Sequence, residues 1–366
     1  MASKVVSAED MQSRLSRLSQ VNFSEAAFLD SVLPEYQRKI SNIIGAGVTE
    51  DPSMRPAITA VEGFNIGFIQ AEKGKGASLH SHSTVEVFMP LKGRWEIFWG
   101  EEGEEVVELD TFDVISVPTG IMRGFRAASD GDNLMMAIVG GNDAGKVAWP
   151  QSLLDRARDA GWTFDEDGNI VEIGTGKTTR SVLAGRESGE TAKSRPITRE
   201  EVLSRVARFG ELNFSEAAFI DAALPEYERK IFNIIGAGVT EDSSLKPAIT
   251  AVEYFNLTLI KAAEGKGASL HSHSTVEVFM PLSGRWAIYW GEDGENEIEL
   301  DPFDVISVPT GIMRGFRNIS GGEQLLLAII GGEDAGKVEW PDDVIERAEN
   351  AGLSRDAEGN IVNAAP

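Results

Sequence analysis

The sequence predicts an all-β protein of two tandem antiparallel sandwiches or barrels with short flanking helices, and three observations support this fold class. The chain is duplicated, because an offset of 191 residues aligns 22–171 with 213–362 without a gap. Each copy contains many short runs rich in β-branched and aromatic residues, separated by turns of glycine, lysine, aspartate and proline. Each copy also has the length of a complete domain and is too long for one repeat of a solenoid.

The duplication sets the expected domain boundaries at 1–171 and 198–366, with a linker over 172–197. The linker is polar, rich in glycine, serine and threonine, and has no sustained apolar periodicity. It includes the run GTGKTT, which shares its last residues with a phosphate-binding loop. That motif needs a glycine where Val171 stands, so no nucleotide site is expected there.

Short helices are expected around each barrel. Residues 7–19 and 198–208 each begin with a serine or threonine followed three residues later by an acidic residue, as in a capping box. A second short helix is expected within 24–36, up to Pro34, with a loop or an arm over 42–51. A helix is also expected to close each copy, over 150–161 and 341–352.

Between these helices the sequence changes to short β-rich runs. In the first copy, strands are expected over 57–62, 64–72, 77–83, 84–91, 93–99, 105–110, 113–118, 123–128 and 133–140. The second copy repeats the pattern 191 residues later. Strands this short and this closely spaced are typical of a small antiparallel sandwich or barrel.

The composition is that of an ordinary globular protein. Hydrophobic residues make up 42% of the chain and charged residues 25%, so each copy can bury a core. No apolar run could span a membrane and the first residues lack the core of a signal peptide, so a cytoplasmic location is expected. The net charge of -24 argues against nucleic acid and anionic membranes as partners. The absence of cysteine excludes disulfides and thiolate metal sites.

The histidines of the chain all lie in two copies of one phrase, GASLHSHSTVEVFMPL, with the spacing H-x-H-x3-E. Side chains two apart on a strand point to the same face, so both imidazoles and the carboxylate are expected to converge inside the barrel. Two histidines and one carboxylate form the facial set of non-haem Fe(II) oxygenases, which leaves coordination positions open. The expected metal ligands are His80, His82 and Glu86 in the first copy and His271, His273 and Glu277 in the second.

This phrase resembles the first motif of the cupin superfamily, G-x-x-x-H-x-H-x3-E-x6-G, with Gly76 and Gly93 at its ends and Gly267 and Gly284 in the second copy. The run FDVISVPTGIMRGFR is similar to the second cupin motif, matched by Asp113, Pro118 and Gly120 and again by Asp304, Pro309, Gly311 and Asn318. Two such domains in one chain resemble the bicupins. The resemblance implies two double-stranded β-helix (jelly-roll) barrels, each with a metal inside, and a homo-oligomer.

The second motif departs from the family at two positions. Arg123 and Arg314 stand where the family has a histidine as its fourth metal ligand, and Phe112 and Phe303 replace the glycine that opens the motif. Arginine stays protonated and is not a metal ligand. The departure therefore puts the fourth coordination position in question.

Two interpretations follow from this arginine. In the first, the three remaining ligands hold a divalent metal, Fe(II) first with Mn(II), Zn(II) and Ni(II) as alternatives, and Arg123 or Arg314 has a catalytic role in gripping an anionic substrate group. In the second, Arg123 forms an ion pair with Glu86, the histidines are only hydrogen-bonded, and no metal binds.

Three functions remain open on this basis. The first is an Fe(II) dioxygenase acting on a small anionic or phenolic substrate, since the chain resembles ring-cleaving bicupins of the gentisate and hydroquinone dioxygenase type. The second is a non-redox metal-dependent lyase, decarboxylase or isomerase, as bicupins similar to oxalate decarboxylase suggest. The third is a metal-free binding or structural bicupin.

Overall fold

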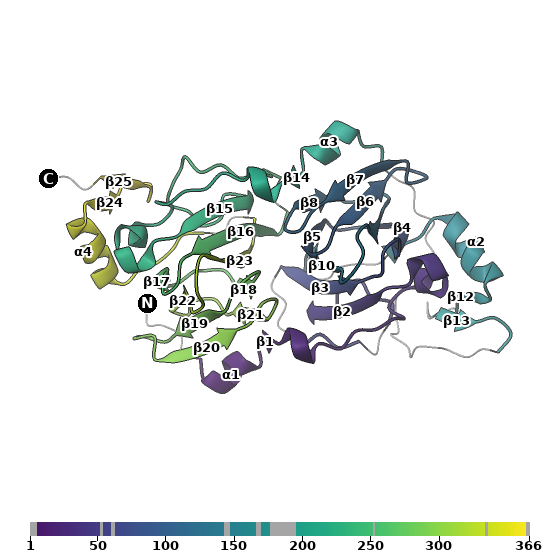
Figure 1. Cartoon of the computed structure of the whole chain (residues 1–366), viewed down its shortest axis with the longest axis horizontal. Coiled ribbons are helices and arrows are strands. Elements are labelled where there is room, and N and C mark those ends of the chain that lie inside the picture. Colours follow the sequence, from purple (N-terminus) through teal and green to yellow (C-terminus); the bar gives the residue numbers. More distant parts are fainter. Residues whose placement is uncertain are drawn as a thin grey trace. The chain divides into compact units, whose positions relative to one another are not determined.

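The computed structural model describes residues 6–51, 54–59, 63–142, 147–165, 170–175, 195–251, 253–333 and 336–363, so most of the expected linker lies outside the described residues. The described chain is mostly β-sheet with a few short helices (Figure 1). It divides into two compact units, Val21–Gly210 and Met1–Gln20 together with Glu211–Pro366. No helix of the described part is long and apolar enough to cross a membrane.

The unit Val21–Gly210 contains the N-terminal barrel, in which two antiparallel sheets enclose one hydrophobic core. Their strand orders are β14-β8-β5-β10-β3-β2 and β11-β4-β9-β6-β7. The strands are β2 Lys39–Ile44, β3 Phe64–Gln70, β4 Gly76–His82, β5 Glu86–Lys92, β6 Trp95–Trp99, β7 Glu105–Leu109, β8 Val114–Val117, β9 Arg123–Ala127, β10 Leu134–Gly140, β11 Val147–Ala148 and β14 Val206–Ala207. Alternate residues of β6, Trp95, Ile97 and Trp99, are buried in this core, as a half-buried strand requires.

The other unit contains the C-terminal barrel, with the strand orders β1-β21-β18-β23-β16-β15 and β17-β22-β19-β20. The strands are β1 Leu15–Ser16, β15 Lys230–Ile235, β16 Phe255–Ala262, β17 Gly267–His271, β18 Glu277–Pro281, β19 Trp286–Trp290, β20 Asn296–Leu300, β21 Val305–Val308, β22 Arg314–Asn318 and β23 Gln324–Gly331. The fold class expected from the sequence, all-β with two barrels, is confirmed.

The helices are fewer and shorter than expected around the start of each copy. The structure has α1 Ala8–Gln12, α2 Gln151–Asp159, α3 Arg199–Leu203 and α4 Asp342–Asn350, with 3₁₀ turns η1 Leu18–Gln20, η2 Leu29–Val32, η3 Pro34–Tyr36, η4 Phe209–Glu211, η5 Ile220–Ala223 and η6 Pro225–Tyr227. Small hairpins follow α2 and α4, formed by β12 Trp162–Phe164 with β13 Ile170–Glu172 and β24 Leu353–Arg355 with β25 Ile361–Asn363.

The predicted caps are present, but the helices behind them end early. The side chains of Ser7 and Thr198 accept hydrogen bonds from the backbone N–H groups of Asp10 and Glu201 at 3.0 and 3.1 Å. Each helix then ends after five residues, and the chain joins a sheet instead. The helix predicted over 24–36 was wrong, since two 3₁₀ turns broken at Leu33 occupy its second half.

The opening segments of the two copies are exchanged between the units. β1 pairs with β21, and Arg17 forms an ion pair with Asp304 at 2.6 Å. β14 pairs with β8, and Arg208 forms the equivalent ion pair with Asp113 at 2.6 Å. Figure 1 accordingly shows α1 beside β20 and β21, and α3 beside β7 and β8. This division differs from the expected boundaries at 1–171 and 198–366, because each segment completes a sheet edge of the other copy.

Two predictions in the region before β3 differ in part from the structure. The run expected to form a loop or arm over 42–51 begins within β2, which pairs with β3 of the same barrel. The strand expected over 57–62 is reduced to one isolated bridge between Ile58 and Ile44, and 60–62 lie outside the described residues. β2 also forms part of the cavity wall described below.

Backbone geometry accounts for Gly76 in the first motif and is unusual at Phe112 and Phe303 in the second. A Cβ at Gly76 would lie 1.9 Å from the carbonyl oxygen of Phe125, so only glycine lets β4 approach β9 this closely. Phe112 and Phe303, which replace the motif glycine, have φ angles of 70° and 68°. Both phenylalanines therefore adopt a left-handed backbone, which is costly for a side chain with a Cβ.

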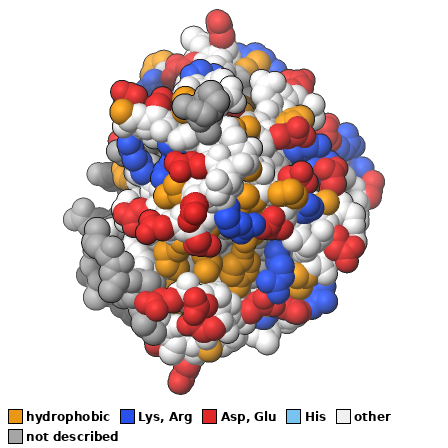
Figure 2. All heavy atoms as spheres, turned by 90° about the vertical axis from the view of Figure 1, so that its left-hand side faces the viewer, with side chains coloured by type: hydrophobic (Ala, Val, Ile, Leu, Met, Phe, Trp, Pro, Cys, Tyr) orange, Lys and Arg blue, Asp and Glu red, His pale blue; other side chains and the backbone are white. Residues whose placement is uncertain are grey.

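Acidic side chains lie among basic ones on the face of the molecule that Figure 2 shows. Figure 2 shows one face of the molecule, on which red and blue side chains intermingle around a patch of hydrophobic side chains. The acidic excess of the chain is therefore not gathered in one block on this face.

Candidate metal centre

The predicted metal ligands come together in each barrel. β4 carries His80 and His82, and β5 begins with Glu86, so one tight turn brings the carboxylate to the imidazoles. One ligand atom from each of these residues lies within 4.8 Å of the other two, and all three residues are buried. The same holds for the second copy, His271, His273 and Glu277.

The first histidine of each cluster is held in the tautomer that suits a metal ligand. Nδ1 of His80 lies 2.8 Å from the carbonyl oxygen of Ser78, and Nδ1 of His271 lies 2.7 Å from that of Ser269. A carbonyl can only accept, so Nδ1 donates and Nε2 keeps its lone pair. Burial lowers the pKa of both histidines well below the usual value, and neighbouring arginines lower it further. Both imidazoles are therefore neutral.

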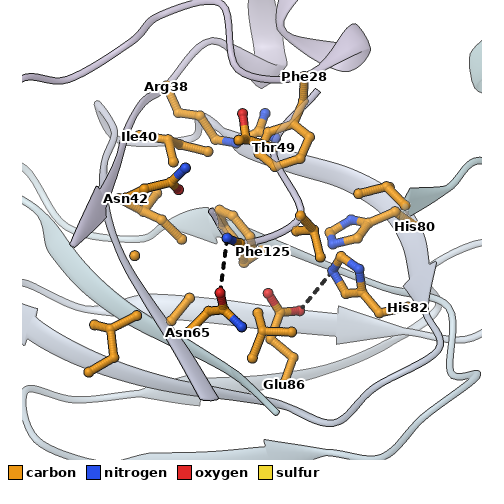
Figure 3. Close-up of a pocket in the computed structure, with 18 of the residues that line it drawn as sticks. Phe28, Arg38, Ile40, Asn42, Thr49, Asn65, His80, His82, Glu86 and Phe125 are labelled. Carbon is orange, nitrogen blue, oxygen red and sulfur yellow. Dashed lines mark hydrogen bonds and ion pairs between the residues drawn. The ribbon is translucent and has the colours of Figure 1, made fainter. Parts of the chain in front are cut away.

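The second histidine of the N-terminal cluster lacks hydrogen-bond partners. Both ring nitrogens of His82 are buried, and neither makes a hydrogen bond within the described part of the chain. Its Nε2 lies 3.4 Å from Oε2 of Glu86 (Figure 3). Buried polar atoms are normally paired, so an imidazole left this way beside two other ligand groups fits a metal-binding role. The donor set, two imidazoles and one carboxylate, fits a divalent transition metal.

The arginine at the position where the cupin motif has its fourth metal ligand forms an ion pair with the glutamate. Arg123 is 0% exposed, and its Nε and Nη2 donate to Oε2 of Glu86 at 3.0 and 2.8 Å. Its Nη1 donates to the carbonyl oxygen of Ile121 at 3.2 Å. Arg314 and Glu277 form the equivalent pair, with Nε donating to Oε2 at 2.9 Å. The ion pair of the second interpretation is thus present, while the neutral histidines retain the ligand geometry of the first.

Burial and charge act in opposite directions on this pair. Burial raises the pKa of Glu277, and the charge and hydrogen bond of Arg314 lower it. Burial lowers the pKa of Arg314, and Glu277 raises it. Because the opposite charges lie only 2.9 Å apart, each favours the charged form of the other.

A cavity opens onto the N-terminal cluster. Its volume is about 60 Å³, and its wall includes the three ligand residues, Arg38 and Asn42 from the β2 region, and Trp149. Figure 3 shows Arg38 and Asn42 across the cavity from the two imidazoles. The corresponding cavity of the C-terminal barrel has about 30 Å³. Arg123 does not line the cavity, so in this arrangement its guanidinium orients Glu86 and does not face the space where a substrate would lie.

Arg38 itself is neutralised by a buried partner. Its Nη1 donates to Oδ1 of Asp30 at 2.9 Å and to the carbonyl oxygen of Gly76 at 3.0 Å. The charge of Arg38 is therefore balanced within the wall of the barrel.

The sequence analysis missed Arg38, Asn42 and Trp149 as cavity residues. All three recur 191 residues later, as Arg229, Asn233 and Trp340, which was the signal that could have found them. The run containing Asn42 was interpreted as a loop or arm, so its side chain could not be placed on an inward face.

Comparison with known proteins shows similarity at the level of the fold. The sequence matches no protein-family model and no curated protein. The structure resembles oxalate decarboxylase from Lactobacillus farciminis in a formate complex, with a TM-score of 0.54 and 11% identity over 94% of this chain and 91% of that chain. A deletion mutant of Bacillus subtilis oxalate decarboxylase gives a TM-score of 0.52 and 14% identity over 87% of this chain and 77% of that chain. At these identities the likeness shows the fold alone.

Proposed function

We propose that this chain is a metal-dependent bicupin enzyme that carries out a non-redox reaction of the lyase or decarboxylase class on a small anionic substrate. The observation that carries the proposal is a buried cluster of two histidines and a glutamate that opens onto an internal cavity. Burying charged groups costs considerable free energy, and such burial is typical of functional sites.

The donor set supports a divalent ion held by His80, His82 and Glu86. Imidazole and carboxylate suit Mn(II), Fe(II), Ni(II) and Zn(II), and geometry and availability decide among these metals. When bound, such an ion supplies a Lewis acid that orients and polarises a carboxylate. Arg123 would act as a positioning residue, because its two donors fix one oxygen of Glu86.

Charge balance supports an anionic substrate. The buried charges of the N-terminal site cancel in pairs, Arg123 with Glu86 and Arg38 with Asp30. His80 is neutral because burial lowers its pKa. A divalent ion would thus add two positive charges that no described residue around the site offsets. Uncompensated charge in a low-dielectric cavity is costly, so binding of a carboxylate is favoured.

A decarboxylase-like reaction is preferred to a dioxygenase for two reasons. The solved structures that share this fold include oxalate decarboxylases. Decarboxylation also needs no oxidant: a carbon–carbon bond breaks, carbon dioxide leaves, and the remaining carbon takes a proton from water. The Fe(II) dioxygenase expected from the sequence would use the same three ligands. The two reactions are therefore distinguished by whether carbon dioxide is released or oxygen is consumed.

The test begins with the metal content of the full chain purified without chelator, compared with His80→Ala, His271→Ala and the double variant. We expect a divalent metal that each single variant reduces and the double variant abolishes. Oxalate and other small carboxylic acids are then screened for carbon dioxide release. Oxygen uptake is measured with dihydroxybenzoates and hydroquinones. Oxygen consumption without carbon dioxide release would replace the lyase by the dioxygenase, and metal binding unaffected by both histidine variants would overturn both.

A further inference from the structure

We infer that the N-terminal barrel is the substrate-binding barrel, and that Asn42 recognises a hydroxyl group on a small carboxylate substrate. In the C-terminal barrel, the side chain of Thr258 occupies the space that this hydroxyl group would need. The inference rests on the proposed function, because the carboxylate of this substrate would be held at the metal. It adds the substrate class, a small hydroxy acid, and the residues that select it.

The amide of Asn42 presents an unused acceptor to the cavity. Asn42 is 6% exposed and lines the cavity together with the histidine cluster. Its Nδ2 donates to the carbonyl oxygen of Ala46 at 2.7 Å, which fixes the orientation of the amide. Oδ1 is then the acceptor that remains, and no described residue donates to it. A buried acceptor with a fixed direction is suited to a ligand donor.

The C-terminal barrel shows which group fits this acceptor. Asn233, the equivalent of Asn42, makes the same bond, with Nδ2 donating to the carbonyl oxygen of Ala237 at 2.7 Å. There, however, Oγ1 of Thr258 donates to Oδ1 of Asn233 at 3.3 Å. A hydroxyl supplied by the protein thus satisfies in one barrel the acceptor that faces the cavity in the other.

The residue equivalent to Thr258 in the N-terminal barrel is Gly67, which brings neither a hydroxyl nor a side chain to the cavity wall. A second wall position changes in the same direction, from Val139 to Ile330. These changes accompany the decrease in cavity volume from about 60 to about 30 Å³. The wall of the C-terminal barrel therefore fills the space that a substrate hydroxyl would need.

The two anchors of the N-terminal barrel face each other. Figure 3 shows the Asn42 amide and the imidazoles of His80 and His82 projecting into the cavity from opposite sides. A ligand that uses both anchors needs an anionic end for the metal and a donor at its other end. A short hydroxy acid meets both requirements, whereas a simple carboxylic acid meets only the first.

The experiment uses the metal-loaded full chain and a matched pair of probes, 3-hydroxypropanoate and propanoate, with binding measured by isothermal titration calorimetry. We expect one site per chain with about a tenfold preference for the hydroxy acid, which corresponds to one net hydrogen bond. Asn42→Leu should reduce this preference to about one. Gly67→Thr should abolish the site, and Thr258→Gly should create a second one.

Gly67→Val is the matched control for Gly67→Thr, since it fills the same space without a hydroxyl. A Cβ at position 67 would lie 3.3 Å from the carbonyl oxygen of Ser41, so both variants require a small adjustment, and their thermal unfolding is compared with that of the wild type. Loss of the site in both variants supports the role of the wall. Equal affinity for the two probes in the wild type, or unchanged binding in folded Gly67→Thr, would overturn the inference. Absence of metal from the wild type would instead overturn the proposed function.

Discussion

The two barrels keep the same metal-ligand cluster but differ in the wall that faces it. The arginine–glutamate distance is 2.8 Å in the N-terminal barrel and 2.9 Å in the C-terminal barrel, and both pairs are buried. The cavities differ twofold in volume, about 60 against about 30 Å³. After duplication, the residues of the histidine–glutamate cluster and those of the cavity wall can thus change independently. A shared motif does not make two sites equivalent.

The largest expected effect tests whether the ion pairs really are equivalent. Replacing Glu86 or Glu277 with alanine leaves a fully buried guanidinium without its partner, as Arg123 and Arg314 are both 0% exposed. Each variant should lose about 3–5 kcal/mol of the free energy of unfolding of its own barrel. Hydrogen exchange followed by mass spectrometry measures this loss barrel by barrel in the metal-free protein.

The control for this prediction removes the charge together with its partner. Glu86→Leu combined with Arg123→Met buries no charge, so the double variant should recover most of the stability that Glu86→Ala loses. The prediction fails if the double variant is as unstable as Glu86→Ala, or if the two alanine variants differ by more than about 1 kcal/mol.

The next effect concerns acid sensitivity, which should also be the same in both barrels. Burial lowers the pKa of His80 and His271 well below the usual value. The unfolded chain therefore takes up protons below about pH 6.5, while these folded imidazoles stay neutral, so stability falls as the pH decreases. Each histidine contributes a slope of up to about 1.4 kcal/mol per pH unit.

Urea unfolding of the metal-free protein between pH 5 and 7 measures this slope. His80→Gln and His271→Gln should each reduce it by one histidine's share, and the comparison with wild type cancels the contribution of the carboxylates. A pH profile unchanged by either substitution would mean that the imidazole takes up its proton over the same pH range in the folded and the unfolded protein.

The sequence predicted the fold class and the ligand clusters because these depend on local spacing. Strand periodicity places alternate residues on one face, and His80, His82 and Glu86 are close in sequence, so their convergence needs only one turn. The ion pair of Arg123 with Glu86 belonged to one of two alternatives, and only the structure shows that the guanidinium donates to this carboxylate. Such a choice depends on three-dimensional surroundings and not on spacing.

The exchange of the opening segments could not be predicted, because a capping pattern followed by a short edge strand does not show which barrel the segment joins. β1 and β14 are both short edge strands of two residues. The sequence does not show which of the two barrels each of them joins. The cavity wall was missed for a different reason. Glycines and polar residues around β2 favoured a loop, whereas pairing with β3 makes it a strand.

The smallest effect distinguishes how the two exchanged segments meet their barrels. Nε1 of Trp290 donates to the carbonyl oxygen of Val6 at 3.0 Å, whereas the buried Nε1 of Trp99 has no acceptor among the described residues. Trp290→Phe therefore breaks a hydrogen bond and Trp99→Phe removes an unpaired donor, although both lose the same ring volume. Trp290→Phe should cost about 1 kcal/mol more free energy of unfolding, measured in urea under identical conditions. Equal costs would mean that the N–H of Trp99 is also satisfied in solution, by water or by a shift of its segment. The two exchanged segments would then contact their barrels in equivalent ways. The difference between the barrels would lie in the cavity walls.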